Sequence, residues 1–130
     1  MQSRVLRFEV GDRTWVLPLH RIREILEVPA VLKVPRCRPQ VVGLVLRRGV
    51  LVPVYDIMPE GSPAGTHVLV LEWGDMLNGL RVTQPEADHA VSEDEEGAME
   101  PPCRGQVKLR SGIAERLDLA LLYELLEIPA

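Results

Sequence analysis

The stretch Gly43-Leu-Val-Leu-Arg-Arg-Gly-Val-Leu-Val-Pro-Val-Tyr-Asp56 decides the fold of this chain. Its two apolar runs, rich in valine and leucine, are typical of strands and flank a single Arg-Gly pair. Gly49 accepts a positive φ, so the chain reverses tightly there and holds Arg48 at the tip of a hairpin. A guanidinium on a rigid turn suits recognition of a partner carboxylate, which indicates docking rather than catalysis.

The composition is that of one folded domain. Hydrophobic residues make up 46% of the 130 residues but aromatic residues only 4%, so we expect a core of Val, Leu and Ile. No apolar run reaches the ~18 residues that span a bilayer, and the first residues lack the apolar stretch of a signal peptide. We therefore expect a cytoplasmic protein that is not inserted directly into a membrane.

The charge is divided unevenly along the chain. Residues 1–48 hold ten basic and four acidic side chains and residues 49–130 hold five and fifteen, which gives +6 and −10. This polarity could allow docking of differently charged partners, but the ordinary explanation is that each half has a solvated face. The basic part lacks interleaved aromatic residues and the whole chain is acidic, so we expect no binding to nucleic acid.

Strand patterns recur along the chain at intervals typical of small barrels. The apolar patterning predicts strands at residues 5–10, 14–17, 42–47, 50–57, 67–73, 80–82, 106–110 and 114–119. A short helical turn is expected at 19–22 and a C-terminal helix at 119–126, whereas 23–28 fits either a helix or a strand.

Three segments are predicted to connect these elements. Residues 58–65 contain four Gly or Pro and divide the chain into parts of similar size, about 1–60 and 66–130. Residues 29–40, with three prolines, and the acidic segment 93–105 are the other connections.

The matching residues of a known family run through essentially the whole chain. They are Phe8-Glu-Val-Gly11, Trp15-Val-Leu-Pro-Leu19, Ile22-Arg-Glu-Ile25, Val34-Pro35, Gly43, Arg48-Gly49, Val52-Pro-Val54, Asp56, Val68-Leu-Val-Leu71, Gly79-Leu80 and Leu117-Asp-Leu119. On these residues the chain resembles the bacterial chemotaxis coupling family, the CheW-like domain. The motifs are more specific in the first half than in the second.

The resemblance implies a single CheW-like domain over residues 1–130, mostly β. Its two SH3-like five-stranded barrels would pack on a shared core, with short helices at the connections and the C-terminus, and strand exchange between the subdomains stays open. It also implies a non-catalytic adaptor without a cofactor. The adaptor would couple the cytoplasmic tip of a chemoreceptor to the regulatory domain of a CheA-type histidine kinase, and these partners would recruit it to membrane receptor arrays.

The resemblance further implies a set of partner-binding residues. Arg48 matches an arginine at the receptor and signalling surface. Ile22 falls in the receptor-binding groove, with Val68 as its counterpart in the second barrel. Glu24 matches an acidic residue near the kinase-facing surface, and His67 is expected beside that region. Ile22 and Val68 also suit the core, and Glu24 also suits a solvated surface.

Two glycines and two arginines complete this set. Gly43 is expected to allow a close backbone approach and Gly49 to form the turn. Where the family usually reads Asn-Leu-Arg-Gly, this chain reads Leu46-Arg-Arg-Gly49. Side chains alternate along a strand, so only one of Arg47 and Arg48 is expected to face a partner, and which one stays open.

A second departure from the family pattern concerns residues 83–85. The family commonly has an Asp where this chain has Thr83, and Pro85 follows. Because proline cannot donate to a ladder, we expect the strand to end there or to lie at an edge.

Two other functions are open. One is a specialised CheW-like protein that binds a single partner, as a decoy or a branch adaptor. The other is a small-barrel enzyme that pairs Cys37 or Cys103 with one of the histidines His20, His67 and His89, although no local signature supports it. The histidines lack metal-ligand spacing, and we expect no metal site.

Overall fold

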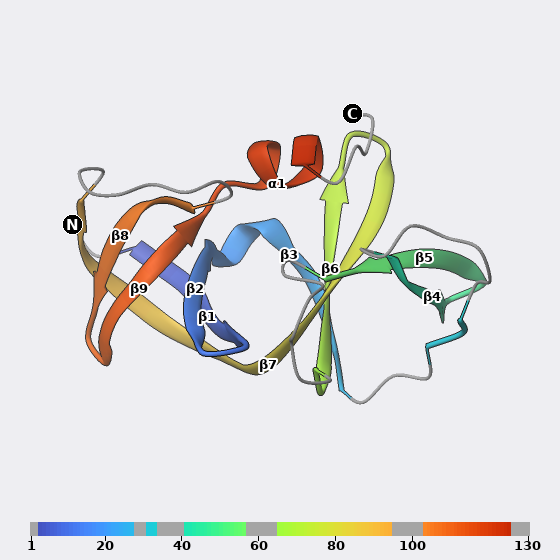
Figure 1. The fold of residues 1–130 in the computed structure, drawn as a ribbon, viewed down its shortest axis with the longest axis horizontal. Helices are drawn as coiled ribbons and strands as arrows, with labels where there is room; N and C mark the ends of the chain where they lie inside the picture. Colours follow the sequence, from blue (N-terminus) through green and yellow to red (C-terminus); the bar gives the residue numbers. More distant parts are fainter. Residues whose placement is uncertain (1–2, 28–30, 34–40, 57–64, 95–102, 126–130) are drawn as a thin grey trace.

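The structure is a computed structural model that describes residues 3–27, 31–33, 41–56, 65–94 and 103–125. These residues form nine strands, a 3-10 helix and an α-helix (Figure 1). The strands are β1 (Ser3–Val10), β2 (Arg13–Pro18), β3 (Ile22–Glu27), β4 (Val41–Arg47), β5 (Val50–Tyr55), β6 (His67–Trp73), β7 (Met76–Asp94), β8 (Cys103–Leu109) and β9 (Gly112–Leu117). The helices are η1 (Leu19–Arg21) and α1 (Leu119–Leu125).

Five strand segments close into a ring of pairings, which we call barrel A. The hairpins β1–β2 and β8–β9 are antiparallel, and β2 joins β9 in a parallel pair. The C-terminal part of β7, residues 83–94, pairs with β8 on one side and with β1 on the other, which completes the ring. Barrel A lies at the left of Figure 1.

The other strands form barrel B, at the right of Figure 1. Its order is β3, β6, the N-terminal part of β7 (residues 76–82), β5 and β4. Leu32, in the segment after β3, forms an isolated bridge to Leu44 of β4. β4 therefore has a neighbour on each side, β5 on one and Leu32 on the other. The five-stranded barrel B is nearly closed as a result.

The two barrels are not the two halves of the sequence. β1 and β2 pair with strands of the C-terminal part, whereas barrel B is built from residues 22–82. The division expected between 1–60 and 66–130 therefore falls inside barrel B, between β5 and β6. Turn residues in the sequence show where one element ends and the next begins, but not which strands pair. The first hairpin pairs with β7 and β9, which are distant in sequence, so the barrels do not follow the division of the sequence.

The single strand β7 runs through both barrels and does not end at Pro85, which corrects the prediction of a strand over 80–82. The register opposite β1 shifts between the pairs Arg7↔Glu86 and Glu9↔Thr83, so β7 carries one extra residue there. Gln84 has a φ of +48°, as expected at a bulge. Around Pro85 β7 pairs with β1 alone, so the missing N–H leaves no ladder partner unsatisfied.

The remaining elements agree with the sequence patterns except at two boundaries. The ambiguous segment 23–28 is a strand, β3, and the C-terminal helix is present as α1. The acidic segment is shorter than expected, because β7 continues to Asp94 and β8 begins at Cys103. Most of the expected connection 29–40 and all of residues 57–64 lie outside the described residues.

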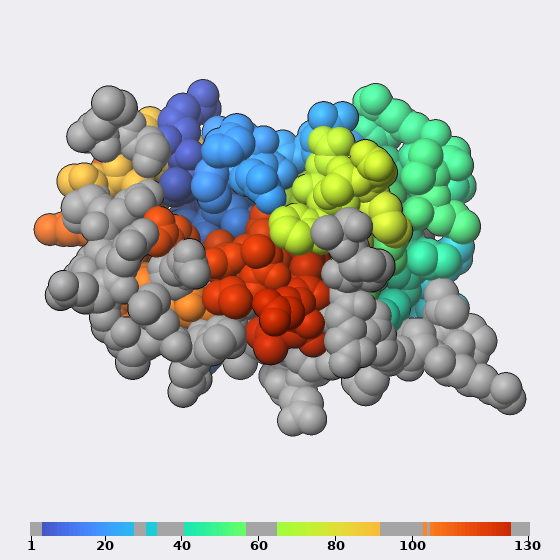
Figure 2. Space-filling view, turned by 90° about the horizontal axis from the view of Figure 1, so that it is seen from above, coloured from blue at the N-terminus to red at the C-terminus, as the bar shows by residue number. Residues whose placement is uncertain are grey.

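The largest core lies between the two barrels. Phe8 and Trp15 of barrel A and Leu69 and Leu80 of barrel B are fully buried in it. α1 lies over the junction of the barrels (Figure 2) and adds Tyr123, whose ring centroid is 4.7 Å from that of Trp73. Residues of both barrels and of α1 therefore share one core.

Candidate docking surface

The hairpin between β4 and β5 presents Arg48 at its tip. Arg47 and Val50 are the last paired residues, so Arg48 and Gly49 form a two-residue loop. Their φ values are +49° and +79°, and a positive φ at both positions is the mark of a type I′ turn. Arg48 is exposed and makes no hydrogen bond or ion pair with the described residues. A rigid turn therefore carries a guanidinium that is available to a partner.

Arg47 behaves differently from its neighbour. Its side chain is half-buried and pairs with Glu24 of β3, a hydrogen-bonded ion pair that joins two strands of barrel B. The sequence left open which arginine is presented, and the structure places Arg48 in solvent and Arg47 against barrel B. The alternation of strand side chains ends at Arg47, because Arg48 already belongs to the turn.

The Arg47–Glu24 pair lines a hollow of barrel B beside the β4–β5 turn. Arg48 and the apolar residues Val50 and Leu77 also line this hollow. The site thus combines charged groups of both signs with an apolar floor, which is a composition suited to protein contacts.

Large apolar side chains surround the tip of the hairpin. Leu46 and Leu51 face each other across β4 and β5 and are 62% and 54% exposed, and Val50 is 50% exposed. Adjacent exposed apolar residues on a rigid sheet are typical of an interaction site. We call Leu46, Arg48, Val50 and Leu51 the hairpin patch.

The other predicted partner-binding residues do not gather at this patch. Ile22 is half-buried against the core between the barrels. Val68 is 1% exposed inside barrel B, which makes it a core residue, the alternative that the sequence had left open. A partner cannot contact its side chain in this conformation.

His67 and Glu24 lie on the adjacent strands β6 and β3 but are not directly opposite each other. His67 is opposite Glu27, whereas Glu24 is opposite Val70, three residues further along β6. The His67 ring is instead held by Thr66, with Oγ1 and Nδ1 2.7 Å apart. Strand pairing, which spacing in the sequence does not reveal, separates the two residues.

Gly43 and Gly49 take the backbone roles expected of them. A Cβ atom on Gly43 would lie 2.2 Å from the carbonyl oxygen of Leu32, so only glycine permits the bridge between Leu32 and Leu44. Both backbone hydrogen bonds of that bridge measure 2.8 Å. Gly49 meets no such obstacle and is required for its positive φ alone.

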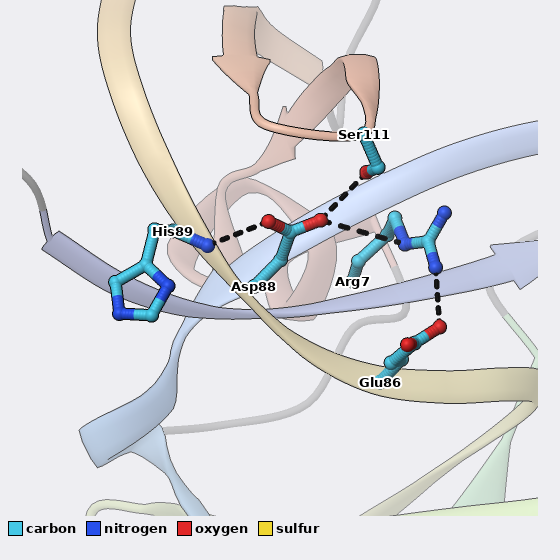
Figure 3. A network of polar contacts seen from close by, with 5 residues as sticks. All are labelled: Arg7, Glu86, Asp88, His89 and Ser111. Atoms are coloured by element: carbon cyan, nitrogen blue, oxygen red, sulfur yellow. Dashed lines mark hydrogen bonds and ion pairs between the residues drawn. The ribbon is translucent and has the colours of Figure 1, made fainter.

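Barrel A carries a polar network that sequence reasoning missed (Figure 3). Arg7 on β1 pairs with Glu86 at 2.5 Å and approaches Asp88 at 3.9 Å. Ser111, in the turn between β8 and β9, donates to Asp88 at 2.6 Å, and the His89 backbone N–H donates to it at 2.7 Å. These contacts, the Ser111 hydrogen bond above all, lower the pKa of Asp88. The residues come from distant segments, so no local signal could have indicated them.

A second ion pair of barrel A supports the core between the barrels. Arg13 donates to the Glu115 carboxylate through Nε and Nη2, at 2.6 and 2.8 Å. Its guanidinium carbon also lies 4.4 Å from the centroid of the Trp15 ring. The pair links β2 to β9, the strands of the parallel pairing, and serves the fold rather than a partner.

The described cysteine is not placed for thiol chemistry. Cys103 is buried and its thiol contacts the Gly105 carbonyl at 3.4 Å. Burial raises the pKa of this thiol, which disfavours the thiolate that a nucleophile requires. Cys37 lies outside the described residues.

The acidic, histidine and cysteine side chains and the helices of the described residues bear on metal and membrane binding. Among these residues no group of His, Cys, Asp or Glu is arranged to hold a metal ion. None of the helices that the structure describes is long and apolar enough to cross a bilayer.

Comparisons with known proteins agree with this architecture. A family model described as the CheW-like domain matches residues 4–127. The crystal structure of the scaffolding protein TtCheW from Thermoanaerobacter tengcongensis is similar in fold, with a TM-score of 0.81 over 95% of this chain and 88% of that chain at 17% identity. No curated protein sequence matches the chain. With nearly its whole length covered by the family model, the chain belongs to the CheW-like domain family.

Proposed function

We propose that this chain is a non-catalytic adaptor that couples the cytoplasmic tip of a chemoreceptor to the regulatory domain of a CheA-type histidine kinase. The observation that carries the proposal is the hairpin patch, where Arg48, which pairs with none of the described residues, stands on a rigid turn among exposed Leu46, Val50 and Leu51. Membership of the CheW-like domain family supports the same role.

In the hairpin patch, charge and apolar contact are expected to contribute differently to the free energy of binding. An exposed ion pair contributes only ~0–1 kcal/mol, so Arg48 alone cannot hold a partner. A typical interface buries roughly 800 Å² on each side, and a few central residues supply most of its affinity. Leu46 and Leu51 are suited to supply affinity and Arg48 to set register.

Neighbouring residues fit two partners rather than one. Glu24 and Arg47 line the hollow beside the hairpin patch, where a kinase domain of the same fold would contact them. Ile22 lies at the passage between the barrels and keeps part of its surface exposed, which suits the groove for a receptor tip.

Co-purification tests this proposal. The chain is mixed with a receptor cytoplasmic fragment and a CheA-type kinase from the same organism, and we expect all three to elute together. Arg48→Glu should remove at least one partner. The matched control is Lys108→Glu, which makes the same charge change at an exposed position of barrel A.

Two outcomes count against the adaptor. Binary complexes without a ternary one favour the decoy or branch adaptor that binds a single partner. Equal binding by Arg48→Glu and Lys108→Glu removes the hairpin patch from the docking surface.

A further inference from the structure

A second surface lies away from the hairpin patch, where η1, the β6–β7 turn and the start of α1 meet. Figure 2 shows α1 in red beside the yellow-green β6–β7 hairpin and the blue of β2 and η1. A cleft at this junction has apolar walls that include Leu17, Pro18, Trp73 and Leu119. The walls come from both barrels and from α1, so the cleft depends on the assembled fold.

Arg21 separates this apolar cleft from a polar hollow beside it. The arginine lines both, and so does Trp73. In the polar hollow Arg23 and Glu72 face each other at 3.5 Å and offset one another in charge. Arg21 makes no hydrogen bond or ion pair within the part of the chain that the structure describes. It is therefore an uncompensated positive charge at the rim of an apolar wall.

The surroundings of Arg21 hold it close to aromatic side chains. Arg21 and Trp73 line the cleft together, and the Tyr123 ring packs on Trp73 with the ring centroids 4.7 Å apart. The carboxylate nearest in the cleft, that of Asp118, accepts the backbone N–H of Leu121 at 3.1 Å and so caps α1. Arg116 also lines the cleft, and its charge is opposite to that of Asp118. A ligand therefore meets a net positive charge, with Arg21 beside an apolar and aromatic wall.

We propose that this cleft docks a short acidic and apolar peptide segment of a partner protein. A carboxylate of the segment pairs with Arg21, and a neighbouring aliphatic side chain packs on Trp73, Pro18 and Leu119. Charge complementarity selects an acidic occupant, because the cleft is lined by two arginines and one aspartate and its net charge is positive. The proposal does not rest on the hairpin patch, which lies on barrel B outside this cleft.

The two tryptophans of the chain provide the test. Trp73 lines the cleft, whereas Trp15 is 0% exposed in the core, so the indole N–H signals give a reporter and an internal reference in NMR spectra of the 15N-labelled full chain. The probe is a capped hexapeptide of alternating leucine and glutamate. Two matched peptides replace glutamate by glutamine or by lysine.

We expect the acidic peptide to shift the Trp73 indole signal and not that of Trp15, with saturation at about millimolar concentration. Arg21→Glu should weaken this binding at least about tenfold, because it converts a charge-assisted hydrogen bond into a repulsion. Arg21→Gln, which keeps a polar side chain of similar shape, should weaken it less. The glutamine peptide should bind more weakly and the lysine peptide not measurably.

Arg48→Glu separates this inference from the proposed function. That variant should lose a partner in co-purification but bind the acidic peptide with unchanged affinity. The inference is overturned by an unshifted Trp73 signal, by equal binding of the lysine peptide, or by equal losses in Arg21→Glu and Arg48→Glu. Spectral dispersion shows that each variant is folded, and Arg21→Gln decides the matter if Arg21→Glu does not fold.

Discussion

Barrel A and barrel B have the same number of strands but use their surfaces differently. In barrel A the arginines Arg7 and Arg13 are each tied to carboxylates of another strand. In barrel B Arg47 is tied in the same way, but Arg48 points into solvent at the tip of a hairpin. Barrel A also exposes charges, at Arg4 and Lys108, but Arg48 of barrel B combines an exposed charge with a rigid turn and exposed apolar neighbours, which suits a partner.

The apolar surface shows the same contrast. Barrel B and the segment after β3 expose the larger set of big apolar side chains, namely Ile25, Leu32, Leu46, Val50, Leu51 and Met76. Barrel A exposes Val91 and Ile113 among its described residues. Single exposed apolar residues are ordinary, but a cluster on one rigid element marks a contact site. If the barrels divide stability and docking in this way, changes in the shared core and in barrel A should lower stability, whereas changes at the hairpin patch should remove binding.

The largest effect is expected where the barrels share one core. Phe8→Ala should lower the free energy of unfolding by about 3–5 kcal/mol, because a fully buried aromatic ring is lost and a cavity remains. Urea unfolding followed by circular dichroism and by tryptophan fluorescence measures it. Both signals should report one transition, and two separate transitions would mean that the barrels do not share a folding unit.

The next effect tests the closure of barrel B. Gly43→Ala should cost roughly 1–3 kcal/mol, because the added Cβ lies 2.2 Å from the Leu32 carbonyl oxygen and the backbone must move. Gly11→Ala is the control, since its Cβ would meet nothing within 4 Å and only the positive φ is strained. Equal losses of stability in the two variants would remove the special role of the Leu32–Leu44 bridge.

A smaller effect concerns the polar network of barrel A. The lowered pKa of Asp88 means that its carboxylate stabilises the fold above its ordinary pKa of 3.8, and that this contribution disappears as the pH falls through the folded-state value. Asp88→Asn should therefore lower stability by about 1 kcal/mol at pH 7. The difference from the unmodified chain should shrink below about pH 4, and urea titrations at pH 7 and pH 3 measure it. A gap that stays constant between these pH values would show that the carboxylate charge is not what matters.

The smallest change in stability is expected from substitutions in the hairpin patch, and these substitutions also test docking most directly. Exchange of both Leu46 and Leu51 for serine should change the free energy of unfolding by less than about 0.5 kcal/mol per site, since both are exposed. Binding of the kinase or the receptor should nevertheless be lost. The matched variant, with Val91 and Ile113 exchanged for serine in barrel A, should keep both partners. If both double variants lose binding alike, the barrels do not differ as proposed.

Much of the fold follows from local patterns in the sequence. Alternation in β1 places Leu6, Phe8 and Val10 on one face, and the structure buries all three in the core between the barrels. The Arg48–Gly49 turn was predictable because a positive φ at Gly49 is the simplest way to join two such strands. Short-range chemistry, in which a residue and its neighbours decide the outcome, was sufficient for these elements.

The features that could not be predicted depend on pairings between distant segments. The Arg47–Glu24 pair joins residues that are 23 positions apart and meet only because β3 and β4 belong to one barrel. From the sequence, Val68 suits either a groove or a core. Its place in the core follows only from the pairing of β6 with β3 on one side and β7 on the other. Pro85 cannot donate to a ladder, and β7 continues past it because β7 pairs there with β1 alone, an edge position that the sequence allowed but could not locate.

The length of β7 limits where residues can be inserted into or deleted from this strand. Since β7 is a wall of both barrels, a one-residue deletion within either part would turn every following side chain from the inside of a barrel to the outside. At Gln84 the residue count opposite β1 is already irregular. The register opposite β8 also shifts, between Ala90 and Ser92. Gain or loss of a residue during evolution is therefore tolerable in β7 at these two irregular positions and hardly anywhere else along it.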